Sequence, residues 1–431
     1  MTRRVAMLVS NACAPDRRVL REAQALVGQG HQVTVIAWDR NRRYPPHETM
    51  EGVQIERIGV ASAYGLGLRR LGHWPGFARQ ALSFLRRGPS NDRGHGESAG
   101  SDTLDWHAIH CHDLDTLPIG YAYARYLRPH SGARTHSDAR THSGARTQDQ
   151  VPLIFDAHES YPDLVAPRLP GWAVTGLRAM ERYLVRRVDA VITVGDRLAQ
   201  HYRRWAGRVV VVRNCPPPSG RRSSQPADLR TGWGLDRIEL VVCYIGGFTS
   251  GRVILPLIEA VKADPSLGLV LVGEGPQAST LLDAADGVDR IVYLGERVPL
   301  DQVVEIMQAA DVVYYGLRAD HPNNHFSSPN ALYSALEAGR PLLTTDVGEI
   351  SQVVQAEGSG LVISQVDDNQ AQPPAAQAIA AALAQLRPAH VRATMSRNAR
   401  HAAETTYNWP AAEAELLNLY QDLWQERWET P

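Results

Sequence analysis

The sequence predicts a two-domain α/β protein in which each domain contains a doubly wound, mainly parallel sheet. Three observations predict it. The chain has 431 residues, which is more than one ordinary hydrophobic core accommodates. Strand-like segments rich in Val, Ile and Leu alternate with amphipathic segments, as is typical of parallel strands joined by crossover helices. Prolines and serines interrupt both patterns over residues 214–230, which we expect to be a linker.

The first half, residues 1–213, contains seven segments that we expect to be strands. In chain order they are VAMLVS, QVTVIAW, VQIERIG, AIHCHD, PLIFDAH, AVITVG and VVVVRN. Two stretches of this half do not resemble core-forming sequence. Residues 88–104 are largely rich in Gly and Ser, and residues 129–150 contain a six-residue tandem repeat. We expect both to be disordered insertions because they offer too little apolar surface to bury.

The second half, residues 231–405, contains six further segments of the same kind. They are LVVCYIGGF, LGLVLVGEG, IVYLGE, DVVYYGL, PLLTT and GLVIS. Residues 406–431 follow the last of them and are expected to form a long amphipathic helix. The sequence therefore predicts two sheet domains in tandem and a terminal helix.

Composition excludes several classes of protein. A net charge of -1 gives no general attraction to nucleic acid, and 44% hydrophobic with 21% charged residues describes a soluble globular chain. The four cysteines follow no metal-ligand spacing and suggest no disulfide framework, which favours a reducing cytoplasm. We find neither a signal peptide nor a run of about 20 apolar residues that could span a membrane. Lys262 is the single lysine, so a phosphate clamp here must use arginine or backbone N–H groups.

Polar residues follow two predicted strands of the first half. His112 and Asp113 end one strand, and Asp156, His158 and Glu159 end the next. Because ligands of open parallel sheets bind beyond the carboxyl ends of the strands, these side chains predict an acid, base or hydrogen-bonding site for a polyol. A structural histidine and a metal site are alternatives. The metal is less favoured because the third strand end offers only a single aspartate.

Two stretches of the second half could bind an anion. GGFTSGR, residues 246–252, combines glycines that let the backbone approach a ligand with the guanidinium of Arg252. In SSPNAL, Ser327 or Ser328 could cap a helix and Pro329 suits its first turn, which leaves N–H donors at the helix start. A tight strand-to-helix turn and an ordinary capped helix are the alternative interpretations.

In this order, the motifs resemble those of the retaining glycosyltransferases of family 4. The matching segments are DRRVLREAQALVGQGHQVTVI, HCHDLDTLP, FDAHE, YIGGFTSGR, LVLVGEGP, ADVVYYGL, SSPNALYSALEAGRPLLTTDVGE and NWPAAEAELLNLYQDL. The resemblance covers nearly the whole chain. It implies a glycosyltransferase B-type (GT-B) fold, with two Rossmann-like domains facing a cleft and a C-terminal helix that crosses back to the first domain. It also implies a nucleotide sugar held mainly by domain two and an acceptor held mainly by domain one.

The resemblance further implies roles for individual residues. The catalytic group is expected to comprise His112, Asp113 and Arg252, with Asp156, His158 and Glu159 on the acceptor side. The residues expected to bind the donor are Gly246, Gly247, Arg252, Gly273, Glu274, Gly275, Arg297, Val298, Ser328, Pro329, Asn330, Leu332, Ser334 and Glu337. Arg252 and backbone dipoles would stabilise the leaving diphosphate, and attack from the same face would retain configuration. No metal and no cofactor are expected.

Two glutamates that the family commonly carries are absent, because their positions hold Phe326 and Ser334. Ser334 could hold the ribose through water, or Glu337, one helical turn later, could reach it. Alternatively, the chain is a noncatalytic GT-B protein that binds or scaffolds a partner glycosyltransferase. A nucleotide-sugar epimerase is less favoured, because it needs carboxylates around the sugar. The intact HCHD, DAHE and GGFTSGR segments favour an active transferase.

The composition of residues 66–89 indicates which class of acceptor to expect. This segment contains five arginines and no acidic residue, interleaved with Trp, Phe and Leu. Such a composition is typical of a helix at the surface of an anionic membrane, although a core-packed helix with a solvated basic face is an equal alternative. The first interpretation predicts a lipid-linked saccharide or a cell-surface glycan as acceptor, at the inner face of the plasma membrane. The second leaves a small soluble acceptor open.

Overall fold

The computed structural model describes residues 1–14, 16–61, 72–88, 106–127, 150–217, 226–364 and 376–428. These residues form two compact units. The first comprises residues 1–194, 198–212 and 413–431, and the second comprises residues 195–197 and 213–412. The two expected insertions, residues 88–104 and 129–150, lie almost wholly outside the described residues.

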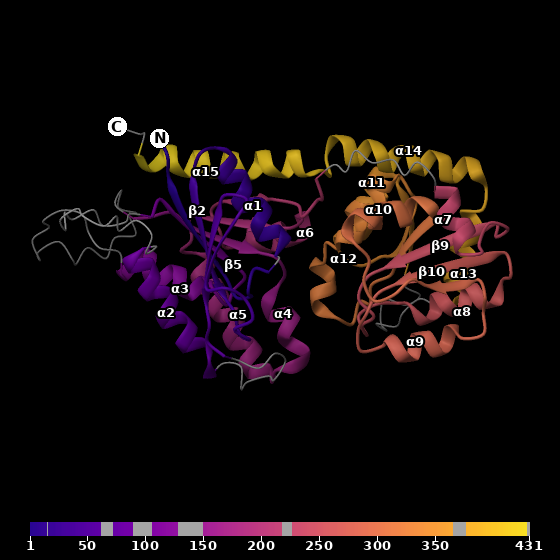
Figure 1. The fold of residues 1–431 in the computed structure, drawn as a ribbon, viewed down its shortest axis with the longest axis horizontal. Helices are drawn as coiled ribbons and strands as arrows, with labels where there is room; N and C mark the ends of the chain where they lie inside the picture. Colours follow the sequence, from indigo (N-terminus) through magenta and orange to yellow (C-terminus); the bar gives the residue numbers. More distant parts are fainter. Residues whose placement is uncertain are drawn as a thin grey trace, which may run out of the picture. The chain divides into compact units, whose positions relative to one another are not determined.

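The first unit is built on an eight-stranded sheet with the order β3-β4-β2-β1-β5-β6-β7-β8. Figure 1 labels two of its strands, β2 and β5. Its strands are β1 (Arg4–Val9), β2 (Gln32–Trp38), β3 (His47–Met50), β4 (Val53–Ile58), β5 (Ala108–His112), β6 (Leu153–Ala157), β7 (Ala190–Thr193) and β8 (Val209–Val211). All neighbours are parallel except β3 and β4. The apolar runs of β1, β5, β6 and β7 are almost completely buried, which is why these segments could be predicted.

Helices connect these strands. They are α1 (Arg17–Gly28), α2 (Trp74–Arg87), α3 (Leu117–Ala122), η3 (Tyr123–Leu127), α4 (Tyr161–Val165), η4 (Ala166–Arg168), α5 (Gly171–Val185) and α6 (Asp196–Tyr202). The side chain of Asp16 caps α1 by accepting from the Val19 N–H at 3.3 Å.

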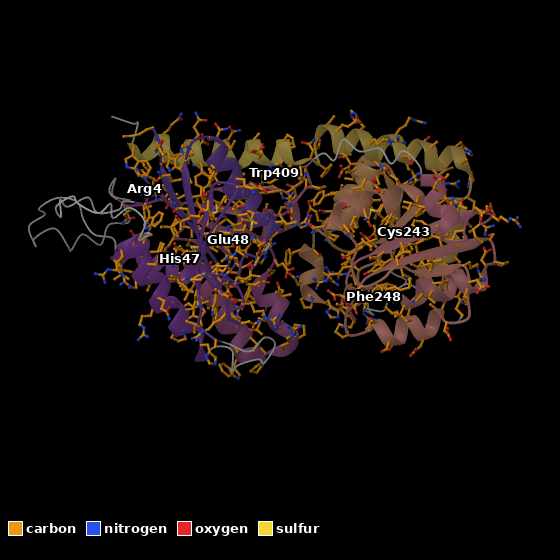
Figure 2. All side chains as sticks on the ribbon, viewed as in Figure 1. Arg4, His47, Glu48, Cys243, Phe248 and Trp409 are labelled. Atoms are coloured by element: carbon orange, nitrogen blue, oxygen red, sulfur yellow. The ribbon has the colours of Figure 1, made fainter. Side chains whose placement is uncertain are left out.

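The second unit contains a six-stranded parallel sheet with the order β11-β10-β9-β12-β13-β14. Its strands are β9 (Leu240–Ile245), β10 (Leu267–Val272), β11 (Ile291–Tyr293), β12 (Val312–Tyr315), β13 (Leu342–Thr345) and β14 (Gly360–Ile363). Its helices are α7 (Pro226–Gly232), α8 (Leu255–Ala263), α9 (Ala278–Ala285), α10 (Leu300–Ala309), η5 (Pro322–Phe326), α11 (Asn330–Ala338), α12 (Gly348–Glu357), α13 (Ala376–Gln385) and α14 (Ala389–Thr405). Figure 2 marks two of its side chains, Cys243 within β9 and Phe248 in the loop that follows it.

The expected two-domain fold is confirmed, and three local expectations change. Helix α7 begins at Pro226, inside the segment 214–230 that was expected to be a linker. Strand β3 was not predicted, because its sequence HETM is polar and its side chains are partly or fully exposed at the edge of the sheet. The start of α11 differs as well, since its N-cap residue is Pro329 and neither Ser327 nor Ser328 makes a side-chain capping bond.

The terminal helix α15 (Trp409–Trp428) returns to the first unit. Leu416, Leu419, Tyr420, Leu423 and Trp424 of this helix are each at most 5% exposed. The indole Nε1 of Trp424 donates to the carbonyl of His107 at 3.0 Å. Within the part of the chain that the structure describes, no helix combines the length and apolarity that a membrane span requires.

Candidate active site

The register of two neighbouring strands brings the polar strand ends of the first unit together. Strand β5 pairs with β6 so that His112 lies beside Asp156. The Asp156 Oδ2 atom accepts from His112 Nδ1 at 3.0 Å and from His158 Nε2 at 3.1 Å, while Oδ1 accepts from Arg18 Nη2 at 2.6 Å. The predicted convergence of these side chains is therefore observed, with Asp156 at its centre.

The sequence-based interpretation missed two charged residues of this cluster. Arg18 and Glu22 of α1 are 6% and 0% exposed, and Arg18 Nε lies 3.0 Å from Glu22 Oε1. A further missed residue, His110 of β5, stacks on His112 with ring centroids 4.3 Å apart. One signal was present in the sequence. Arg18 and Glu22 are four residues apart and lie on the same helix face as the buried Ala25 and Leu26.

The same cluster contains a set of atoms that could ligate a cation. One nitrogen or oxygen from each of Glu22, His110, His112 and Asp156 lies within 4.8 Å of the others. The second carboxylate of this possible cation site thus comes from Glu22 of α1, and not from the end of the third strand, where it was expected from the sequence. The guanidinium of Arg18, however, is paired with both carboxylates. The cluster therefore balances its negative charge with its own residues.

Burial and neighbouring charges shift the pKa values of this cluster in opposite directions. Burial, supported by the nearby His110, lowers the pKa of His112 to about 3, so this imidazole is neutral. Burial opposes protonation of His158 too, but Asp113 and Asp156 outweigh it and raise its pKa to about 9. Burial and the adjacent Asp156 raise the pKa of Glu22 to about 8. The cluster thus pairs a neutral His112 with a cationic His158.

Exposure decides which of these groups can meet a substrate. The side chains of His158 and Asp113 are 20% and 32% exposed, whereas His112 is completely buried. His158 Nδ1 lies 3.6 Å from Asp113 Oδ2, so the two form one edge of the cluster. Glu159 is exposed in the loop that follows β6. The structure thus places His158 and Asp113 at the accessible edge and the expected catalytic His112 behind them.

In the second unit, two loops of the expected donor site pack against each other. The N–H of Phe248 donates to the carbonyl of Glu274 at 2.8 Å. A Cβ atom at Gly273 would lie 2.0 Å from the Gly246 carbonyl oxygen, and one at Gly275 would lie 2.4 Å from that of Phe248. These two glycines are therefore required by close backbone approach. The Glu274 carboxylate pairs with Arg297 on the exposed side, while Gly247 is exposed and Val298 is half-buried.

Arg252 connects the first loop to the region before α11. Its Nε donates to the Tyr315 hydroxyl at 3.1 Å, and its Nη1 donates to Asn324 Oδ1 at 3.2 Å. Among the described residues, its Nη2 makes no hydrogen bond. Asn324 is 6% exposed and also bonds the carbonyls of Gly251 and Arg318. Tyr315 and Asn324, which we did not predict, thus hold the guanidinium in place.

The start of α11 has the properties of an anion site, although not for the expected reason. Pro329 precedes the helix in an extended conformation, and Ser328 Oγ bonds the Tyr333 hydroxyl at 2.7 Å instead of capping. The N–H groups of the first turn therefore lack a side-chain cap among the described residues. One of them is not available to a ligand, since the N–H of Leu332 donates to the Pro329 carbonyl at 3.0 Å.

One face of α11 remains partly accessible. Asn330 is exposed, and Ser334 and Glu337 are half-buried, whereas the other residues of the helix are buried. Their spacing of four and seven residues places them on one side of the helix. The side chain of Leu332, which we expected at the donor site, is completely buried in the core instead. Ser334 and Glu337 are thus placed on a common face, as predicted.

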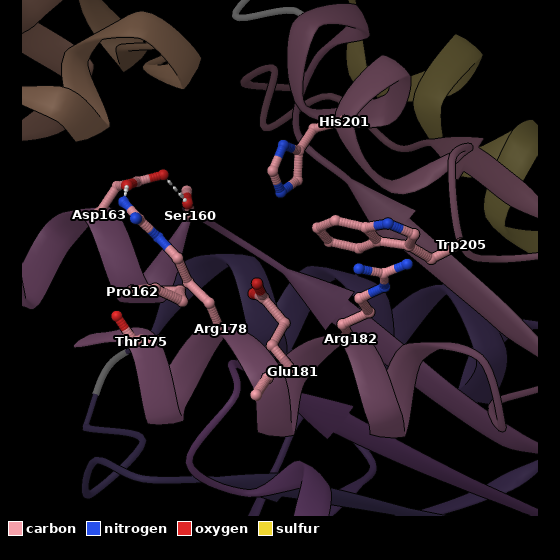
Figure 3. Close-up of a pocket in the computed structure, with 10 residues that line it drawn as sticks. Ser160, Pro162, Asp163, Thr175, Arg178, Glu181, Arg182, His201 and Trp205 are labelled. Atoms are coloured by element: carbon pink, nitrogen blue, oxygen red, sulfur yellow. Dashed lines mark hydrogen bonds and ion pairs between the residues drawn. The ribbon is translucent and has the colours of Figure 1, made fainter. Parts of the chain in front are cut away.

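A pocket of about 400 Å³ lies in the first unit among α4, α5 and the end of α6 (Figure 3). Its lining includes Asp163, Arg178, Glu181, His201 and Trp205. This pocket could not be predicted from the sequence, because its lining residues come from three separate helices and from the loops beside them. At its base Glu181 is 1% exposed and accepts a hydrogen bond from the Tyr202 hydroxyl at 2.7 Å. Burial raises the pKa of Glu181 to about 7.

Part of the predicted interfacial segment 66–89 is described, as helix α2. Its apolar residues Phe77, Ala81 and Leu85 are at most 1% exposed, so they pack in the core of the first unit. Arg79, Arg86 and Arg87 are exposed. The structure thus fits a core-packed helix with a basic outer face, and these buried residues cannot insert into a membrane.

Comparison with known families and structures agrees with the expected fold. Residues 14–215 match the family described as glycosyl transferase 4-like domain, and residues 239–386 match the family of glycosyl transferases group 1. A comparison with curated protein sequences gives no match.

Solved structures show the same architecture. A sucrose-phosphate synthase from Thermosynechococcus elongatus has a TM-score of 0.74 and 18% sequence identity, over 98% of this chain and 100% of that one. HepE from Anabaena in complex with UDP-glucose has a TM-score of 0.66 and 15% identity, over 97% and 99% of the two chains. A trehalose-6-phosphate protein from E. coli bound with UDP-2-fluoro glucose has a TM-score of 0.66 and 10% identity, over 98% and 99%. At these identities the likeness establishes the shared fold.

Proposed function

The chain belongs to the glycosyl transferases of group 1, and we propose that it transfers a sugar from a nucleotide-sugar donor to an acceptor with retention of configuration. The observation that supports this most is the arrangement around Arg252. The guanidinium of Arg252 is held by Tyr315 and Asn324 and follows a glycine turn in the sequence. Asn324 belongs to η5, the short helix that precedes the uncapped start of α11. Such a group suits a diphosphate, because fixed donors stabilise the charge that develops on the leaving group.

The donor would be held by the second unit. We expect the diphosphate at Gly246, Gly247, Arg252 and the start of α11. The base would lie near the loop of Glu274 and Arg297, and the ribose would face Ser334 and Glu337. Uridine diphosphate sugars are the first donors to test, because the compared HepE and E. coli structures contain UDP-glucose and a UDP-glucose analogue. The diphosphate contacts that we propose require neither a metal nor a cofactor.

The acceptor would be held by the first unit, at the edge formed by His158 and Asp113. A hydroxyl group that binds there meets a cationic imidazole and a carboxylate, which suits a saccharide, lipid-linked or small-molecule acceptor. We further propose that the protein works in the cytoplasm, in the synthesis of a cell-surface glycan. The exposed arginines of α2 would then contact the anionic inner face of the plasma membrane peripherally.

A thermal-shift screen against nucleoside diphosphates and nucleotide sugars tests the donor site, since a ligand that binds only the folded state raises the melting temperature. We expect a shift with one nucleotide and, with the matching sugar donor, turnover of a saccharide acceptor. Binding without turnover on any acceptor would instead support the noncatalytic scaffold. A well-folded sample that binds no nucleotide would contradict the proposed donor site.

Two arginine variants locate the binding site within the second unit. Arg252→Ala removes the guanidinium and is expected to abolish the nucleotide-induced shift. Arg237→Ala serves as the matched control, because its side chain is 96% exposed and lies outside the group around Arg252. Equal shifts in both variants would show that the diphosphate binds elsewhere.

A further inference from the structure

The C-terminal helix reaches the active-site cluster of the first unit through one residue. Tyr420 of α15 is 1% exposed, and its hydroxyl lies 2.9 Å from His110 Nδ1. Arg427 of the same helix pairs with Asp189 at 2.5 Å, and Trp424 bonds the His107 carbonyl, so the helix is fixed on the C-terminal side of this contact. A residue 310 positions away in the chain therefore contacts the layer directly behind His112.

The partners of His110 determine where its proton lies. Its other nitrogen, Nε2, faces Asp156 Oδ2 at 3.6 Å and Glu22 Oε2 at 3.7 Å. Burial raises the pKa of Tyr420 well above its ordinary value, so the hydroxyl keeps its proton. Because Asp156 favours a proton on Nε2, Nδ1 is the acceptor and the hydroxyl donates to it. The proton of the neutral imidazole is then on Nε2, directed at the ionised Asp156. The opposite tautomer would place a lone pair against Asp156.

Asp156 connects His110 to the two histidines that donate hydrogen bonds to it, His112 and His158. With Nε2–H of His110 directed at it, Asp156 stays ionised and accepts from His112 Nδ1 and His158 Nε2. The Nε2 atom of His112 is then an unprotonated acceptor. It is buried and makes no hydrogen bond within the described residues. His158, protonated on both nitrogens, directs Nδ1–H towards Asp113.

We propose that Tyr420 is a positioning residue of the transfer reaction, which holds the ring of His110 and, through it, the orientation of the stacked His112 and of Asp156. This role in catalysis rests on the proposed function, whereas the proton positions do not. The other charged or titratable groups that face His110 or His158 are Asp16, Arg18, Glu22 and Asp113. None of these groups bonds the Nδ1 atom of His110, so the tyrosine hydroxyl alone holds this side of the ring, opposite the side that faces Asp156.

Imidazole ¹⁵N NMR of the full chain tests the proton positions without any activity assay. In the wild type we expect His110 as the Nε2–H tautomer and His158 as a cation at neutral pH. Detection of Nδ1–H on His110 in the wild type would overturn the proposal. In Tyr420→Phe, which keeps the buried ring, we expect His110 to keep its proton on Nε2, because Asp156 still faces that nitrogen, while Nδ1 loses its hydrogen bond and its ¹⁵N resonance shifts.

Kinetics test the catalytic consequence. Tyr420→Phe is expected to lower kcat about tenfold, the effect of losing one buried hydrogen bond, with the KM for the donor unchanged and an altered pH profile. Tyr202→Phe is the matched control, because it also removes one hydroxyl from a buried tyrosine of the first unit, and this hydroxyl bonds Glu181 rather than a histidine of the cluster. Equal kinetics and unchanged histidine spectra in both variants would refute the positioning role. If the wild type lacks turnover, the proposed function fails while the NMR result still decides the proton positions.

Discussion

Ser334 stands at one of the two positions where the resemblance implies a glutamate that this chain lacks. Its side chain is half-buried on the accessible face of α11, four residues after Asn330 and three before Glu337. The resemblance implies that a glutamate commonly stands here and accepts hydrogen bonds from ribose hydroxyls. A serine is too short to accept from two hydroxyls at once, so in the proposed donor site the diphosphate contacts would contribute a larger share of the binding.

Restoring that carboxylate is expected to strengthen donor binding. Ser334→Glu should lower the Kd of the nucleotide sugar about tenfold, since a hydrogen bond to a charged group contributes about 1.5–3 kcal/mol. Titration calorimetry with the donor identified by thermal shift measures the change. Ser279→Glu adds the same charge at an exposed position of α9 and should leave the Kd unaltered. Equal affinities in all three proteins would show that the ribose does not face α11.

Glu181 gives the protein a pH-dependent stability. Burial raises its pKa from an ordinary 4.5 to about 7, so the folded state holds a proton that the unfolded state releases between these values. This contribution is fully present below about pH 4.5 and is lost as the pH rises through about 7, a change on the order of 3 kcal/mol. Glu181→Gln cannot titrate, so it should remove this loss. Chemical unfolding at pH 5 and pH 8 measures it, and an unchanged pH dependence in the variant would contradict the assignment.

At the scale of elements, the secondary structure could be predicted best where a continuous run of apolar residues, or a single glycine, determines the conformation. The buried parallel strands are continuous apolar runs, and each could be predicted, as could the helix α11 with its left-handed Gly339 end. Strand β3 and the Pro329 cap follow instead from pairing and loop packing. Likewise, His112, Asp156 and His158 could be predicted from strand ends. Arg18, Glu22 and Tyr420 could not, because charged or polar residues on amphipathic helices are normally exposed.

The contact between the loop that follows β9 and the loop that follows β10 depends on the glycine at position 275. Gly275 has a φ of +150°, and a Cβ there would lie 2.4 Å from a backbone oxygen, which cannot move aside easily. Gly275→Ala should therefore separate the loops and abolish the nucleotide-induced thermal shift. Gly287→Ala is the control, since Gly287 also has a positive φ of +72° but no atom within 4 Å of the added Cβ. It should cost only about 1 kcal/mol of stability and leave binding intact. Normal nucleotide binding by the Gly275 variant would show that the contact is dispensable.

At the scale of the whole molecule, chain order and structural units do not coincide. The first unit is made of the N-terminal half together with α15, whose five large apolar side chains are almost completely buried in it. The second unit is completed before α15 packs, since its own sheet, β9 to β14, and helices α7 to α14 precede residue 409. The N-terminal sheet therefore acquires part of its core only after nearly the entire chain is made.

This organisation predicts that removing α15 destabilises the first unit and leaves the second unit stable. Burying one large apolar side chain contributes about 1.5–3 kcal/mol. Removing Leu416, Leu419, Tyr420, Leu423 and Trp424 together therefore cancels most of the roughly 5–15 kcal/mol that stabilises a domain. A chain that ends at Ala412, the last residue of the second unit, should show no cooperative unfolding of the first unit, while the second unit keeps its transition and its nucleotide-induced shift. Calorimetry distinguishes the two transitions, with a chain that ends at Trp428 as the control. Two full-sized transitions in the shorter chain would mean that the first sheet is stable without α15, and that the contact of Tyr420 with His110 acts on the site alone.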